Sequence, residues 1–125
     1  GRVITDLISK DEDVQIVAGI DAYTGIANDY PVFKSIKECD VKADAIIDFA
    51  VTAAIDDLLD YAVETKTPVV VCTTGLSAQQ LDKVHEASKS VAVLRSANMS
   101  LGINTLMKVL KIATDVLAHR GLHIR

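Results

Sequence analysis

The stretch VVVCTTGLSAQQ, residues 69–80, carries the signals that decide the fold. Three consecutive valines are typical of a strand that is buried on both faces of a parallel sheet. Gly75 can adopt the positive φ of a tight turn, and Ser77 has the spacing to Gln80 of a capping box. The stretch therefore predicts a buried strand, a short turn and a helix that runs to about Ala87.

Two adjacent hydroxyls stand between that strand and its turn. Thr73 and Thr74 follow Cys72 at the point where the predicted strand ends. They suit a plain strand-to-helix turn, and they equally suit a turn whose hydroxyls and amides contact a phosphate or a carboxamide of a ligand. The residues of this stretch leave both interpretations open.

The rest of the chain alternates between short apolar runs and amphipathic segments. Runs at 14–20, 44–50, 68–72 and 91–94 predict neighbouring strands of one parallel sheet, with helices on both of its faces. Strands that alternate with helices imply right-handed crossovers, so the predicted fold is a doubly wound, Rossmann-like α/β sheet. The amphipathic segments that predict the helices are 55–63, 77–87 and 103–117.

Both ends of this sheet are expected to be incomplete. Residues 1–10 read as a helix, whereas a doubly wound domain normally begins with a strand and a glycine-rich turn. The expected first strand and that turn are therefore lacking. Residues 121–125 read as the start of a strand that leads into a further, absent domain. We expect residues 1–120 to form a partial dinucleotide-binding domain.

Composition excludes several classes of function. The net charge is −4 and no basic stripe is present, which argues against a nucleic-acid partner. No apolar run is long enough to predict a membrane span. Cys39 and Cys72 are far apart, which favours reduced thiols and a cytoplasmic location. His119 and His123 are four residues apart, but no further ligand completes a metal site, so none is assigned.

Polar residues gather where the predicted strands end, which is where open α/β sheets bind ligands. Asp21 follows the 14–20 run and suits either a turn cap or an acceptor for the ribose hydroxyls of a dinucleotide. Phe49 suits either core packing or a ring against a cofactor. After the 91–94 run comes a polar loop of small residues, which includes Ser96, Ala97, Asn98 and Met99.

These stretches together resemble a known family. Asp21 after a strand, PVF (31–33), IDFA (47–50), TTGLS (73–77) and SANMSLGIN (96–104) have the order and spacing of the 4-hydroxy-tetrahydrodipicolinate reductase family. The resemblance is to the cofactor-binding domain of this enzyme of bacterial lysine and diaminopimelate biosynthesis. It implies hydride transfer from NADH or NADPH to a cyclic imine dicarboxylate.

The resemblance also implies roles for individual residues. Asp21 matches the acid that binds the ribose, and Cys72, Thr73 and Thr74 match a loop that the family usually writes G-T-T. Phe49 belongs to the matching IDFA stretch. Ser96, Ala97, Asn98 and Met99 match the loop that reaches the nicotinamide end. Cys72 stands where the family has glycine, and no residue of this chain matches the catalytic acid.

Further expectations follow from the same resemblance. The chain alone is expected to be inactive, and the whole enzyme is expected to form a homo-oligomer through the second domain. No basic residue follows Asp21 until Lys34, which favours NADH over NADPH. One alternative is a coenzyme A-binding domain similar to that of the succinyl-CoA synthetase α subunit, on PVFKSIKE (31–38) and VVVCTTG (69–75). Another is a non-catalytic fragment that packs against a partner chain.

Overall fold

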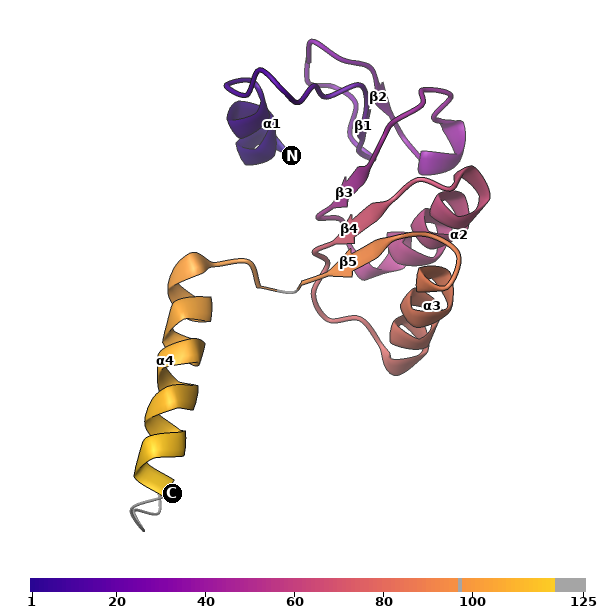
Figure 1. Ribbon diagram of the computed structural model, residues 1–125. Coiled ribbons are helices and arrows are strands. Elements are labelled where there is room, and N and C mark those ends of the chain that lie inside the picture. Colours follow the sequence, from indigo (N-terminus) through magenta and orange to yellow (C-terminus); the bar gives the residue numbers. More distant parts are fainter. Residues whose placement is uncertain (97, 119–125) are drawn as a thin grey trace. The chain divides into compact units, whose positions relative to one another are not determined.

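The computed structural model describes residues 1–96 and 98–118 (Figure 1). These residues form two compact units, one comprising Gly1–Arg95 and one that begins at Ser96. The first unit contains two parallel sheets and three α-helices, and the second contains one long helix. The predicted strand at 121–125, His119 and His123 lie outside the described residues.

The larger sheet consists of β3 (Ile46–Asp48), β4 (Val69–Val71) and β5 (Val93–Arg95), in that order across the sheet. All pairs are parallel, and Ile47 lies opposite Val70, which lies opposite Leu94. The predicted parallel pairing of these three strands is confirmed. Each strand is shorter than the apolar run that predicted it. Three residues of 44–50 and three of 68–72 are paired, whereas β5 pairs two residues of 91–94 together with Arg95.

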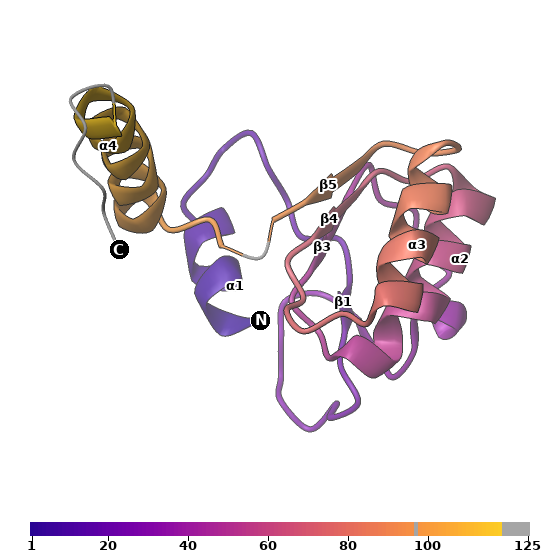
Figure 2. The same ribbon diagram turned by 90° about the horizontal axis from the view of Figure 1, so that it is seen from below.

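Helices α2 (Ile55–Thr65) and α3 (Ala78–Ser88) form the crossovers between these strands. They lie side by side along the same face of the sheet (Figure 2). Apolar side chains of the two helices meet those of the sheet in one buried cluster. Its members are Ile55, Leu58, Leu59, Ala62, Val69, Val71, Val84, Ala87 and Val91.

The opposite face of this sheet differs from the expectation. Side chains alternate between the two faces of a strand, so Ile47, Val70 and Leu94 form a row on the face away from α2 and α3. Ile47 is 50% exposed and Leu94 is 58% exposed. Within residues 1–95, the second layer of helices that the pattern predicted is therefore not packed on this face.

The smaller sheet pairs β1 (Gly19–Ile20) with β2 (Val32–Phe33) in parallel. The prediction that the 14–20 strand neighbours the other three is wrong, because β1 pairs only with β2 among the described residues. The prediction of a strand over the whole run is also wrong, since only Gly19 and Ile20 of the run form a paired strand. A two-stranded ribbon has few neighbours to stabilise a longer ladder.

The first helix makes a side-chain hydrogen bond to the segment that precedes β2. Helix α1 (Arg2–Ile8) confirms the helix predicted over 1–10, with an earlier end. The hydroxyls of Thr5 and Tyr30 lie 2.8 Å apart and share a hydrogen bond. A Cβ added to Gly19 would come within 3.0 Å of the Tyr30 ring. Glycine at position 19 therefore lets the ring approach the strand closely.

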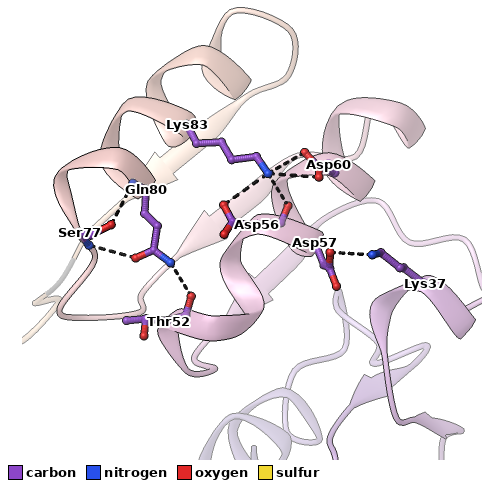
Figure 3. A network of polar contacts seen from close by, with 8 residues as sticks. All are labelled: Lys37, Thr52, Asp56, Asp57, Asp60, Ser77, Gln80 and Lys83. Carbon is purple, nitrogen blue, oxygen red and sulfur yellow. Dashed lines mark hydrogen bonds and ion pairs between the residues drawn. The ribbon is translucent and has the colours of Figure 1, made fainter.

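The start of α3 has the capping box that the sequence predicts. The Ser77 hydroxyl accepts from the Gln80 amide, and the Gln80 side chain accepts from the Ser77 amide (Figure 3). Gly75 has the expected positive φ, +76°. Lys83 of α3 forms ion pairs with Asp56 and Asp60 of α2.

The described part of the second unit comprises a short loop and α4 (Leu101–Ala118). Apolar side chains recur around this helix, and most of those described are at least half exposed within the structure, Leu106 and Leu110 among them. The predicted helix at 103–117 is thus confirmed. In the part of the chain that the structure describes, no helix combines the length and the apolar character needed to cross a membrane.

Candidate functional site

The carboxyl ends of β3 and β4 meet at one edge of the larger sheet, and a buried acid lies there. Asp48, the last residue of β3, is 7% exposed. Its backbone carbonyl accepts from the Cys72 amide at 2.9 Å, which extends the ladder one residue beyond β4. The parallel register pairs Asp48 with Val71. This register brings the segments that follow the two strands next to each other.

The Asp48 carboxylate bonds to both of these segments. Its Oδ1 accepts from the Ala50 amide at 2.9 Å. Its Oδ2 accepts from the Thr73 hydroxyl at 2.7 Å, and the same hydroxyl lies 2.9 Å from the Ala50 carbonyl oxygen. Thr73 is itself only 5% exposed. The hydrogen of the Thr73 hydroxyl is therefore directed into the protein.

Cys72 is likewise buried, at 7% exposed. Burial raises the pKa of its thiol, and the nearby negative charge of Asp48 raises the pKa further. Both effects favour the neutral thiol over the thiolate. The Cys72 side chain therefore adds no negative charge to this edge of the sheet at neutral pH.

Other groups of the same edge face outward. The Phe49 side chain is 59% exposed, so within the structure it does not take the core position that was one of its two interpretations. Thr74 and Gly75 are also exposed. Apart from Gly75 itself and its two chain neighbours, no heavy atom of the described residues lies within 4 Å of a Cβ built on Gly75. An aromatic ring, a hydroxyl and an open stretch of backbone thus lie after β3 and β4.

Asp21 lies at the end of the other sheet. Its backbone amide donates to the Phe33 carbonyl at 2.9 Å, which continues the β1–β2 ladder. Its side chain is exposed, and Oδ1 accepts from the Tyr23 amide at 2.9 Å. This hydrogen bond forms an Asx turn, which orients the carboxylate. The turn-cap interpretation of Asp21 is thus realised, and it leaves the carboxylate accessible to solvent.

The polar loop before α4 belongs to the second unit, which begins at Ser96. The Asn98 side chain accepts from the Ser100 amide, and the Asn98 carbonyl accepts from the Ser96 hydroxyl and the Asn104 side chain. Met99 is 50% exposed. Ala97 lies outside the described residues. These bonds hold the loop against the first turns of α4.

The structure therefore brings together part of the predicted site. Phe49, Cys72, Thr73 and Thr74 share one sheet edge, whereas Asp21 belongs to the smaller sheet and the 96–99 loop to the second unit. Sequence reasoning missed the role of Asp48, although an acid at the end of an apolar run is a signal for a buried partner. The role of each predicted residue in binding a ligand stays a prediction.

A separate hollow of about 330 Å³ lies between α2 and α3. Leu59, Val63 and Ala87 contribute its apolar lining, and Asp60 and Lys83 are among its charged residues. None of the predicted site residues lines it. Among the described residues, no group of three or more His, Cys, Asp or Glu side chains is arranged to hold a metal ion.

Comparison with known families gives a match over most of the chain. Residues 1–99 match the family described as "Dihydrodipicolinate reductase, N-terminus". The match includes Asp21, Asp48, Phe49 and the 72–75 turn, and it ends within the loop before α4.

Curated relatives carry the same enzyme name. The chain is 48% identical over 111 residues to the 4-hydroxy-tetrahydrodipicolinate reductase of Clostridium novyi, with 89% of this chain and 44% of the relative covered. It is 44% identical over 117 residues to the enzyme of the same name from Caldanaerobacter subterraneus, with 94% and 46% covered. The chain thus spans about half the length of these relatives.

Proposed function

This chain belongs to the family of the dihydrodipicolinate reductase N-terminal domain, and from that premise we propose that it is the cofactor-binding part of such a reductase. The whole enzyme would transfer a hydride from a nicotinamide dinucleotide to a cyclic imine dicarboxylate, in lysine and diaminopimelate biosynthesis in the cytoplasm. The family match over residues 1–99 is the observation that carries the proposal. The relatives' names favour it over the coenzyme A-binding alternative.

The edge after β3 and β4 supports a ligand site of this kind. Open parallel sheets bind ligands beyond the carboxyl ends of their strands. The exposed Phe49 ring, the Thr74 hydroxyl and the backbone around Gly75 lie there. Because a Cβ at Gly75 would meet open space, a ligand group has room to approach the backbone amides of this turn. We propose that the dinucleotide binds along this edge. Because the family resemblance assigns Ser96, Ala97, Asn98 and Met99 to the nicotinamide end, we propose that role for them as well.

The steady oxidation of cofactor by the full-length protein tests this function. We expect a decrease in nicotinamide absorbance with enzymatically generated imine substrate and either NADH or NADPH, and none without the substrate. The 125-residue chain is expected to show no turnover, because no residue in it matches the catalytic acid. A full-length protein that binds coenzyme A and oxidises neither cofactor would contradict the proposal.

We further propose that one strand joins the two sheets in the full-length protein. The described residues contain no strand pair between β1–β2 and β3–β4–β5. A strand parallel to both would complete one doubly wound sheet. Amide hydrogen exchange tests this proposal. The amides at the free edges of β1 and β3 would be paired by the added strand, so they should exchange more slowly in the full-length protein than in this chain. Equal exchange would contradict it.

We also propose that the preferred cofactor is NADH. The Asp21 carboxylate can accept hydrogen bonds from two ribose hydroxyls. In NADPH one of these hydroxyls carries a phosphate, and like charges about 4 Å apart repel by about 4 kcal/mol at an effective dielectric constant near 20. Residues 21–29 are exposed and contain no Lys or Arg that could offset this repulsion. The small-molecule substrate and homo-oligomer assembly belong to the second domain in this proposal.

A further inference from the structure

We propose that Asp48 and Thr73 are positioning residues, which join the two ligand-facing segments of the site through a buried hydrogen bond and do not themselves contact the cofactor. The inference rests on the proposed function, because it assigns roles within the same edge. It separates Thr73 from Thr74, two neighbouring hydroxyls that the sequence presents as equivalent.

The first argument concerns the hydroxyl of Thr73. A threonine hydroxyl has one hydrogen to donate. That hydrogen is directed at two acceptors of the protein, Asp48 Oδ2 at 2.7 Å and the Ala50 carbonyl at 2.9 Å. A phosphate offers only acceptors, so the Thr73 hydroxyl has no hydrogen left for it. With 5% of its surface exposed, the residue is also inaccessible to a ligand as large as a dinucleotide.

The second argument concerns what Asp48 holds in place. Through Oδ1 it accepts from the Ala50 amide, and through Oδ2 it accepts from Thr73. One carboxylate thus fixes the segment after β3 and the segment after β4 to each other. Phe49 lies between Asp48 and Ala50, and Thr74 follows Thr73 directly. The exposed groups are therefore attached to backbone that this carboxylate orients.

The third argument is the cost of breaking the bond. A buried carboxylate that loses one of its donors keeps its charge with less compensation, and the penalty exceeds that for a neutral pair. Thr73→Val should therefore displace the turn, since the turn must open to hydrate Asp48 Oδ2. Asp48→Ala removes the acceptor of both the Thr73 hydroxyl and the Ala50 amide. Each change should therefore displace the turn after β4.

A double-mutant cycle on cofactor affinity in the full-length protein tests this inference. We expect Thr73→Val and Asp48→Ala each to raise the dissociation constant for NADH by about fivefold or more. The dissociation constant of the double variant should rise by less than the product of the two single fold-changes, because both changes break the Asp48–Thr73 bond. Thr73→Ser keeps the hydroxyl and should bind within about twofold of wild type. The KM for the cofactor should rise while kcat changes little.

The outcomes that overturn the inference are distinct from failure of the proposed function. If the fold-changes of the two single variants multiply in the double variant, Thr73 acts on the cofactor independently of Asp48 and the inference fails. The inference also fails if Thr73→Ser raises the dissociation constant for NADH as much as Thr73→Val does. If thermal unfolding shows that one of these variants does not fold, the NADH affinities of Thr73→Ser and Thr74→Val are compared instead. The inference requires Thr74→Val to weaken binding more than Thr73→Ser. Wild-type protein that binds neither NADH nor NADPH would overturn the proposed function itself.

Discussion

The side-chain amide of Gln80 donates to the backbone carbonyl of Thr52 at 2.7 Å, which joins the start of α3 to the 3-10 turn before α2 (Figure 3). The same side chain accepts from the Ser77 amide at 3.0 Å. Gln80 therefore closes its own capping box and also links two crossovers. Thr52 takes part through its backbone carbonyl.

Loss of both Gln80 side-chain hydrogen bonds should lower the free energy of unfolding more than loss of the Ser77 cap alone. We expect Ser77→Ala to lower the free energy of unfolding by about 1 kcal/mol. Gln80→Ala should lower it by about 1–2 kcal/mol, because two hydrogen bonds are removed. Urea unfolding of the full-length protein measures both. Gln79→Ala, an exposed neighbour in the same helix, is the control, and a Gln80→Ala variant no less stable than this control would contradict the prediction.

Glycine at the C-cap of α2 should stabilise the folded protein. Lys66 is the C-cap of α2 and has φ 58°, ψ 29°, in the left-handed region. A side chain there costs about 1–2 kcal/mol, and glycine avoids this cost while losing some chain entropy on folding. We expect Lys66→Gly to raise the unfolding free energy by about 0.5–1 kcal/mol.

Lys89 offers a matched control for this change. It is the C-cap of α3, but its φ of −75° lies in the right-handed region. Lys89→Gly should therefore give no gain and a loss of about 0.5–1 kcal/mol. Thermal unfolding of both variants is the measurement. If Lys66→Gly and Lys89→Gly changed the free energy of unfolding equally, the left-handed backbone conformation of Lys66 would not be what makes glycine favourable there.

Asp21 should set the choice between the two nicotinamide cofactors. In the full-length protein we expect the dissociation constant for NADH to be no higher than that for NADPH. Asp21→Ala should remove both the ribose hydrogen bonds and the repulsion of the phosphate. The ratio of the dissociation constant for NADPH to that for NADH should therefore fall by about tenfold or more. Fluorescence titration with each cofactor measures it. NADPH binding ten times tighter than NADH in wild type, or an unchanged ratio in the variant, would refute the assignment.

Cys72 should react slowly with thiol reagents. Burial raises the pKa of its thiol, and only the thiolate is nucleophilic. At pH 8 we expect iodoacetamide to alkylate Cys72 in a Cys39→Ser variant at least about tenfold more slowly than Cys39 in a Cys72→Ser variant. The two rates should converge in denaturant. Equal rates in the folded proteins would show that the burial of Cys72 is transient.

The same shift has a consequence for stability at alkaline pH. The pKa of Cys72 is higher in the folded protein than in the unfolded chain, so the folded state holds its proton more tightly. This contribution to stability is present below the unfolded thiol value of about 8.5 and declines as the pH rises toward the folded value. Cys72→Ser should lose this part of the alkaline dependence, as unfolding at several pH values would show.

The sequence by itself determined the local features of this protein. Consecutive valines predict β4, the Ser77 and Gln80 spacing predicts the start of α3, and Gly75 predicts a positive φ. The helix start and the turn depend on contacts within a few residues, and the valine run marks a segment suited to a buried strand, so the pattern of a short stretch is sufficient. The order and spacing of the motifs likewise indicated the family that the comparison shows.

Only the tertiary structure decided which strands pair and which polar groups face inward. β1 pairs with β2 because strand pairing depends on which neighbours are available, and no local pattern encodes this. Asp48 and Thr73 are 25 residues apart. Their contact arises from the register that sets Asp48 beside Val71. Thr73 therefore points into the protein and Thr74 points out, a distinction between identical side chains that only the packing of two strands creates.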